Sequence, residues 1–172
     1  MSQSPIRNLT RCALCAALLC ICGWISLPLP GIAVTMQTFG VFLTLLLLGG
    51  SRGSLTILLY LLLGCAGLPV FSGFQGGVGV LLGPTGGYLW GFLLSAMIYR
   101  ICEGRLPEPG TLFLGLLGCY GCGTLWYYCG YLGGAGSILP VLAQCVLPYL
   151  VPDLAKLFLA HRLSQKLSSL VS

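Results

Sequence analysis

Between residues 12 and 99 of this chain, the only charged side chain is Arg52. A helix of about 20 apolar residues is long enough to cross a bilayer. The whole chain is 57% hydrophobic and 6% charged, and its mean hydropathy of +0.99 lies outside the range of soluble domains. We therefore expect an all-α integral membrane protein, because a helix satisfies its own backbone hydrogen bonds in lipid.

Six apolar segments, separated by glycine and proline turns, are the candidate membrane helices. They cover residues 9–27, 39–48, 54–66, 84–99, 111–132 and a last segment that starts at Pro152. Another apolar piece at residues 137–147 precedes the last segment, so prolines break the final helix. Only residues 1–10 and 164–172 have the character of solvated tails, and we expect one membrane domain over residues 1–172.

Positive charges occur in alternate connections of this six-helix arrangement. The connections at residues 28–38, 67–83 and 133–137 carry no charge, whereas the other connections and both tails contain arginine or lysine. This pattern satisfies the positive-inside rule with both termini in the cytoplasm. The net charge of +5 is therefore explained by the membrane, and we expect no nucleic acid partner.

The ten cysteines do not form a recognisable site. Nearly all lie within the apolar segments, where cysteine packs as a small apolar side chain. Cys12 with Cys15 and Cys119 with Cys122 have C-x-x-C spacing, but no second ligand pair completes a zinc or redox site. The only histidine, His161, lies in the basic cluster that follows the last segment. We expect no metal, no cofactor and no enzymatic activity.

A glycine-rich, charge-free stretch at residues 64–92 is the candidate ligand-binding loop. Glycine takes positive φ and lets the backbone approach a ligand closely. The alternative is that glycines at four-residue spacing, such as Gly87 and Gly91, serve helix packing. We assign the part before Pro84 to the ligand and the part after it to packing. The candidate contacts are Phe71, Phe74, Gln75, Gly83, Thr85, Tyr88 and Trp90.

Three polar side chains, Thr35, Gln37 and Thr38, stand in the uncharged connection that follows the first segment. They could cap the next helix or reach a ligand beneath the glycine-rich loop, and the sequence leaves both open. The short segments 39–48 and 54–66 favour a cavity open to the outside, because non-helical backbone at membrane depth must be covered by protein or water.

Asp153 and Lys156 are the only charged residues within an apolar segment. Residues three apart share one face of a helix, and ionisable groups at membrane depth usually mark a substrate path. If the helix begins at Pro152, its first backbone N–H groups would also attract a carboxylate near Lys156. The alternative is an ion pair that satisfies only itself.

Four motifs of the chain form a recognisable set: GCAGLPVF at residues 64–71, QGG at 75–77, LGPTGGY at 82–88 and LPYLVPDLAK at 147–156. Together they resemble the BioY family of biotin transporters. Members are the membrane-embedded substrate-binding components of energy-coupling-factor transporters. The resemblance implies a six-helix fold in the bacterial plasma membrane, with outer loops that close over biotin.

The same resemblance implies roles for single residues. Lys156 would neutralise the biotin carboxylate, and Asp153 would accept hydrogen bonds from the ureido group. Ala13 and Ala17 match the small-residue motif through which such components contact a transmembrane coupling subunit. The chain has no G-x-x-x-x-G-K-[ST] motif, so energy would come from partner ATPases. The alternatives are another vitamin such as lipoate or thiamine, a stand-alone facilitator, or a structural adaptor.

Overall fold

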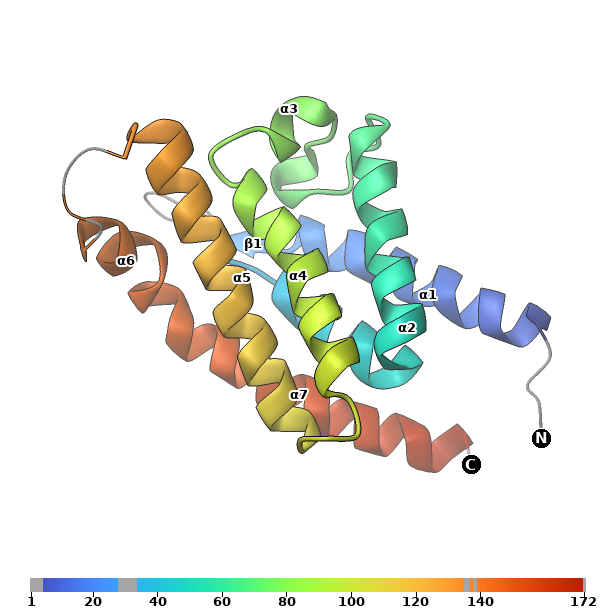
Figure 1. The fold of residues 1–172 in the computed structure, drawn as a ribbon. Coiled ribbons are helices and arrows are strands. Elements are labelled where there is room, and N and C mark those ends of the chain that lie inside the picture. The colour runs from blue at the N-terminus through green and yellow to red at the C-terminus, as the bar shows by residue number, and fades with distance from the viewer. Residues whose placement is uncertain (1–4, 28–33, 135–136, 138, 172) are drawn as a thin grey trace.

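The computed structural model describes residues 5–27, 34–134, 137 and 139–171. Its described part is helical apart from a two-stranded sheet and short turns (Figure 1). In the sheet, Ser26 pairs with Thr35 and Leu27 with Val34 in antiparallel register. The elements are α1 (Pro5–Trp24), β1 (Ser26–Leu27), β2 (Val34–Thr35), α2 (Gln37–Cys65), the 3-10 helix η1 (Ser72–Phe74), α3 (Val78–Leu81), α4 (Gly86–Cys102), α5 (Glu108–Tyr131), α6 (Leu139–Cys145) and α7 (Leu147–Val171).

The expectation of an all-α membrane protein is confirmed. Helices α1, α2 and α5 are each long and apolar enough to cross a bilayer, and α6 with α7 qualifies as one bent span. Large apolar side chains also remain exposed on the outside of the bundle, such as Leu55 at 65%, Val151 at 74% and Phe158 at 65%. A soluble monomer rarely exposes such a surface, whereas lipid covers it in a multi-pass protein.

The second and third predicted segments are two arms of α2. They meet at Gly49, whose φ of 74° and ψ of 171° are not helical, and glycine reaches this positive φ without strain. The Gly50 N–H at the start of the second arm donates to Glu103 Oε2 at 2.9 Å. A carboxylate is favourable at a helix N-terminus, so the end of α4 stabilises the bend.

The predicted start of the last helix at Pro152 is wrong. The break lies at Val146, where α6 and α7 meet at an angle of 42°, and Pro152 is inside α7. Pro148 takes the first turn of α7, where a missing N–H costs nothing. Pro152 then leaves only the Pro148 carbonyl without its helical partner. In the first turn of α7, the Tyr149 and Leu150 N–H groups donate to the Val146 carbonyl at 3.0 and 3.1 Å, so they are not left for a ligand near Lys156.

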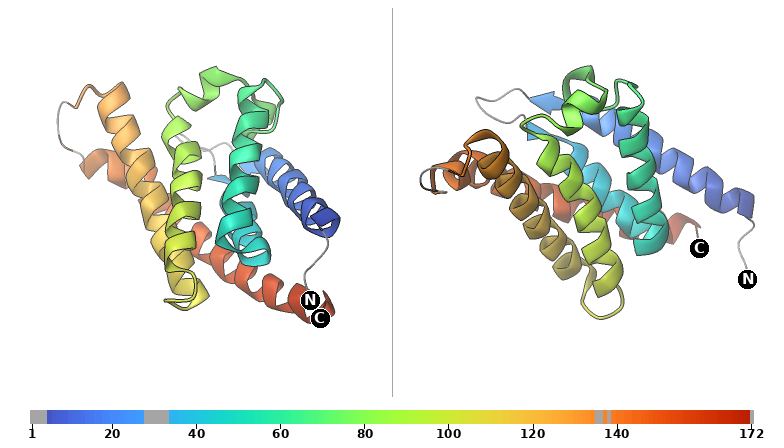
Figure 2. Two further views of the ribbon diagram at one scale, coloured as in Figure 1. Left: turned by 45° about the vertical axis from the view of Figure 1, so that its right-hand side comes forward. Right: turned by 45° about the horizontal axis from the view of Figure 1, so that its top comes forward.

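Helices α4 and α5 lie side by side in all views (Figures 1 and 2), and small residues allow this approach. A Cβ added at Gly87 would overlap Trp126, and one added at Gly91 would overlap Cys119. The Ser95 hydroxyl donates to the Gly115 carbonyl at 2.5 Å. The packing role predicted for glycines after Pro84 is confirmed by this interface.

The first turns of α1 and the last turns of α7 lie at the same end of the molecule (Figure 2). A groove between them is lined by Arg7 and Arg11 from α1 and by Ser164 and Ser168 from α7. The glycine-rich stretch, with η1 and α3, lies beside the C-terminal end of the second α2 arm, away from the last turns of α7 (Figure 1). This arrangement separates the basic ends of the chain from the candidate ligand-binding loop.

Candidate binding cavity

A cavity of about 330 Å³ lies between the helices and beneath the glycine-rich stretch. This volume is at the lower end of the range for small-molecule sites. Its wall combines apolar and aromatic side chains with polar groups from every part of the chain. The polar residues in it are Ser26, Thr35, Gln37, Thr38, Ser72, Gln75, Thr85, Tyr88, Tyr120, Tyr149, Asp153 and Lys156.

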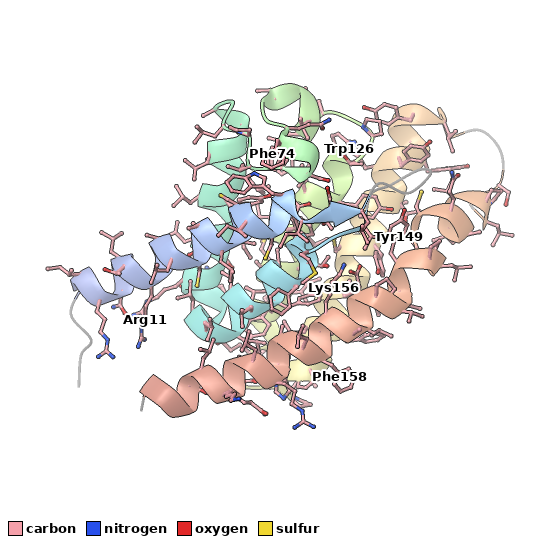
Figure 3. All side chains as sticks on the ribbon, turned by 180° about the vertical axis from the view of Figure 1, so that it is seen from behind. Arg11, Phe74, Trp126, Tyr149, Lys156 and Phe158 are labelled. Atoms are coloured by element: carbon pink, nitrogen blue, oxygen red, sulfur yellow. The ribbon has the colours of Figure 1, made fainter. Side chains whose placement is uncertain are left out.

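Asp153 and Lys156 of α7 form the charged part of this wall. Lys156 Nζ lies 2.7 Å from Asp153 Oδ1, and the two residues are only 8% and 5% exposed. The Lys156 side chain points from α7 toward the interior of the bundle, whereas Phe158 points outward (Figure 3). The predicted placement of this cation away from lipid is thus confirmed.

Each of the two charges has further hydrogen-bond partners. Lys156 Nζ also donates to the Thr35 carbonyl at 2.7 Å and to Thr38 Oγ1 at 3.3 Å, which accounts for its three N–H groups. Thr38 Oγ1 donates to Asp153 Oδ1 at 2.9 Å, and the Tyr120 hydroxyl donates to Asp153 Oδ2 at 2.7 Å. The pair is therefore fully satisfied and joined to α2 and α5.

Gln37 braces the loop above the cavity. Its Nε2 donates to the Tyr60 hydroxyl at 2.6 Å, which in turn donates to the Val70 carbonyl at 2.9 Å. Thr35 Oγ1 accepts from the Gln37 backbone N–H at 3.3 Å at the start of α2. Thr35 and Gln37 line the cavity and also support local structure. The N-cap of α2 is Met36, which makes no side-chain capping bond, and contact of these residues with a ligand stays a prediction.

Phe71 closes one side of the cavity from the glycine-rich stretch. Its ring is 1% exposed and packs edge-on against Tyr60, with centroids 5.6 Å apart. It lies over Gly64 so closely that a Cβ there would overlap the ring. The glycine in the second arm of α2 is therefore needed to seat Phe71.

Trp24 fastens the same loop to the end of α1. Its Nε1 donates to the Pro69 carbonyl at 2.7 Å, and its ring stacks on Phe74 with centroids 5.3 Å apart. We call residues 67–77 the outer loop. It is thus held from α1 by Trp24 and from α2 by Tyr60.

Most of the predicted contacts line the cavity. These are Thr35, Gln37, Phe71, Gln75, Thr85, Tyr88, Asp153 and Lys156.

The prediction for Gly83 needs correction. It lies outside the cavity wall, and its carbonyl accepts the Trp126 Nε1 hydrogen at 3.1 Å because the chain there turns toward α4. Phe74 and Trp90 are also outside the wall. Phe74 stacks on Trp24, and Trp90 Nε1 donates to the Leu81 carbonyl at 3.3 Å.

Sequence reasoning missed several residues of the wall, above all Tyr120 and Tyr149. Tyr120 lies in the middle of α5 among apolar and glycine residues. Nothing in such a sequence distinguishes an aromatic residue that lines a cavity from one that packs in the core. Tyr149 lies near Lys156 on the inner side of α7 (Figure 3). Its position one or two turns before the charged pair on α7 is the signal that could have found it.

A multi-pass bundle that encloses a small cavity with one buried charge pair has the architecture of a membrane protein that binds a small molecule. The sequence model of the BioY family matches residues 1–172. The chain belongs to this family, as its motifs predicted.

Relatives and a solved structure agree with this assignment. The chain is 39% identical to "Biotin transporter BioY" of Thermotoga maritima over 151 residues, covering 88% of this chain and 80% of the relative. It is 36% identical to "Probable biotin transporter BioY" of Pyrococcus horikoshii over 163 residues, covering 94% and 96%. A crystal structure of the S-component for biotin from an ECF-type ABC transporter superposes with a TM-score of 0.85 at 22% identity, covering 98% of this chain and 95% of that one.

Proposed function

We propose that this chain is a membrane-embedded biotin-binding component, which captures biotin from the outer side and releases it to the cytoplasm. The observation that carries the proposal is the Asp153–Lys156 pair in the wall of an otherwise uncharged cavity, in a chain whose relatives are named biotin transporters. Buried charges at membrane depth are costly and mark substrate sites.

The contact between the two charges revises how biotin would bind. The carboxylate and the ureido group lie at opposite ends of biotin, so they could reach Lys156 and Asp153 separately only if the 2.7 Å pair came apart. A ureido group is neutral and places N–H donors beside a carbonyl acceptor. It therefore matches a carboxylate and an ammonium that stand side by side. Asp153 would accept a ureido N–H, and Lys156 would donate to the ureido carbonyl in place of its longest hydrogen bond, the one to Thr38 Oγ1 at 3.3 Å.

The apolar part of the cavity suits the bicyclic body of the ligand. Phe71 from the outer loop and Leu89 and Phe92 from α4 are buried in the wall, and Tyr88 and Tyr149 add aromatic surface. Such surfaces hold a ring by area burial and contact. The ureido end would then point toward α7 and the acid tail toward the outer loop.

The proposed partners are a transmembrane coupling subunit and its ATPases. Ala13 and Ala17 are exposed on the outer side of α1, where small side chains permit close approach of another helix. The first turns of α1, with Arg7 and Arg11, and the last turns of α7 lie at one end of the bundle, which supports a cytoplasmic position for the termini. The proposed location is the plasma membrane of a bacterium, and the protein acts as a transporter component rather than an enzyme.

Uptake of radiolabelled biotin by cells that lack their own biotin transport tests this function. We expect the chain to support saturable uptake when it is expressed with the coupling subunits, and unlabelled biotin to compete better than lipoate or thiamine. Preferred competition by thiamine, which is cationic, would contradict the assignment. Uptake without the coupling subunits would identify a stand-alone facilitator.

A further inference from the structure

The groove between the first turns of α1 and the last turns of α7 is a second hollow in the molecule. Its volume is about 640 Å³, which falls within the range of about 300–1,000 Å³ for small-molecule sites. Arg7 and Arg11 of α1 line one side of it, and Ser164 and Ser168 of α7 line the other. We call it the basic groove. It shares no described lining residue with the central cavity around Asp153.

The two arginines give the groove its positive charge. They are four residues apart and therefore lie on one face of α1. Arg11 extends from α1 to the side on which the last turns of α7 lie (Figure 3). A guanidinium carries five N–H groups in a planar fork that matches two phosphate oxygens. An arginine that is engaged within the protein thus still has donors for a phosphate.

The serines on the opposite wall direct their hydrogens into their own helix. The Ser164 hydroxyl donates to the His161 carbonyl at 2.9 Å, and the Ser168 hydroxyl donates to the Ser164 carbonyl at 2.9 Å. Both hydroxyl groups therefore serve α7, and the charged donors for an anion come from α1.

Glu108 is the acidic residue among the described residues that line the groove. Its Oε2 lies 3.3 Å from His161 Nδ1, and its side chain is 54% exposed, so water also screens its charge. Two guanidinium groups against one such carboxylate leave the groove positive. A ligand that fills it should therefore be an anion.

Leucines line the part of the groove that leads away from the first turn of α1. Leu14 follows Arg11 by three residues and is 66% exposed. Residues 46–48, at the end of the first arm of α2, are half-buried leucines on the same wall. A soluble phosphate would leave this apolar surface uncovered, whereas the acyl chain of a phospholipid would cover it.

The groove also lies at the depth of lipid headgroups. Arg11 is the last charged residue before an uncharged stretch that ends at Arg52, so α1 passes there from the membrane surface into hydrocarbon. In the proposed orientation this surface faces the cytoplasm, where the leaflet contains anionic lipids. Basic pockets between membrane helices on this side bind the headgroups of such lipids.

In that orientation, and independently of the ligand in the central cavity, we propose that the basic groove binds one anionic phospholipid of the cytoplasmic leaflet. Its phosphodiester lies on Arg7 and Arg11, and one acyl chain lies along Leu14 and residues 46–48. The ligand class is glycerophospholipids with a negative headgroup, such as phosphatidylglycerol. A zwitterionic lipid is disfavoured because its ammonium group is repelled by the positive groove.

Native mass spectrometry of the purified full chain tests this site, in micelles that contain phosphatidylglycerol and phosphatidylcholine with the same acyl chains. The unchanged protein should retain one phosphatidylglycerol with a preference of at least about tenfold over phosphatidylcholine. Arg7→Gln with Arg11→Gln should lose this preference. Arg52→Gln with Arg105→Gln is the matched control, because both are exposed arginines outside the groove. Equal retention of the two lipids by the unchanged protein, or equal loss in both double variants, would overturn the proposal.

Competition and assembly exclude the other occupants of the groove. Excess inorganic phosphate should not displace the lipid, and displacement would identify a site for soluble anions instead. If the Arg7/Arg11 variant keeps the lipid but no longer copurifies with the coupling subunits, the groove is a protein contact and the proposal is wrong. Biotin titration of the same variant should give the affinity of the unchanged chain. Absence of biotin binding by the unchanged chain would contradict the proposed function and leave the lipid site standing.

Discussion

The Tyr120 hydroxyl of α5 donates a 2.7 Å hydrogen bond to Oδ2 of Asp153 on α7. The other carboxylate oxygen of Asp153 accepts from Lys156 and Thr38. Three helices thus converge on one buried carboxylate and fix its orientation. A rigidly held acceptor of this kind suits the recognition of one small polar group, because little freedom remains to be lost on binding.

Removal of this bond in Tyr120→Phe should weaken biotin binding while the fold persists. The bond exists in the free protein and contributes about 1.5–3 kcal/mol to its stability. Loss of the positioned acceptor should raise the dissociation constant by roughly tenfold, which is about 1.4 kcal/mol of binding free energy. The measurement is a binding titration of the purified variant. Tyr127→Phe on the same helix is the control, since Tyr127 stacks on Tyr131 outside the cavity. Equal affinities in all three proteins would exclude a role for the Tyr120 hydroxyl.

The charge pair should show an asymmetry between single and double substitutions. Asp153→Asn or Lys156→Gln alone leaves an uncompensated buried charge, which costs about 3–5 kcal/mol of stability. The double variant carries no net charge change and should unfold close to the temperature of the unchanged protein. Thermal unfolding in detergent measures this. A double variant less stable than both single variants would contradict the reasoning.

Gly64→Ala should disturb the seat of Phe71. The added methyl group would overlap the Phe71 ring, and overpacking of this kind costs about 1–3 kcal/mol. We expect weaker biotin binding because Phe71 is displaced from the cavity wall. Gly121→Ala is the matched control, because a Cβ at that helical position meets nothing within 4 Å. If both substitutions leave affinity unchanged, Phe71 does not need this seat.

Trp24 should control how long the outer loop stays closed. Trp24→Ala removes the hydrogen bond to the Pro69 carbonyl and the stack on Phe74. The dissociation rate of bound biotin should therefore increase by about tenfold or more, since a hydrogen bond and an aromatic contact each contribute about 1 kcal/mol. Stopped-flow exchange against unlabelled biotin measures the rate. Trp90→Ala, outside the cavity, should leave the rate unchanged, and an equal effect of both substitutions would argue against a specific role for Trp24.

The exposed face of α1 should matter for transport and not for binding. Ala13→Leu with Ala17→Leu should abolish biotin uptake in cells that express the coupling subunits, because the larger side chains block close helix contact. The purified variant should still bind biotin. Ala155→Leu is the control, since Ala155 is exposed on α7. Normal uptake by the double α1 variant would remove α1 from the partner interface.

The sequence predicted the charged part of the site because charge is so unfavourable at membrane depth. Asp153 and Lys156 had few places to lie other than a cavity, and the uncharged connection with Thr35 and Gln37 pointed to the outer side. Tyr120 could not be distinguished from aromatic residues of the core by sequence. Its role depends on Asp153, which faces it from another helix. Tertiary contacts decide such cases.

Proline and glycine motifs were less informative about detail. The fixed φ of Pro152 suits the first turn of a helix, and it also allows a position inside a helix that packs against its neighbours. Here Pro152 is inside α7. Gly83 fitted a glycine motif that lets the backbone approach a ligand. It lies instead in a turn, and its carbonyl accepts a hydrogen bond from Trp126 Nε1. Local backbone preferences narrow the conformations of these residues, but packing selects among them.

The most direct test of the account is a calorimetric titration of biotin into the purified chain and into the Asp153→Asn/Lys156→Gln double variant, with Lys166→Gln as a control outside the cavity. The account predicts saturable binding to the unchanged chain and to the control, and at least a hundredfold weaker binding to the folded double variant. Undiminished binding by the double variant would contradict it.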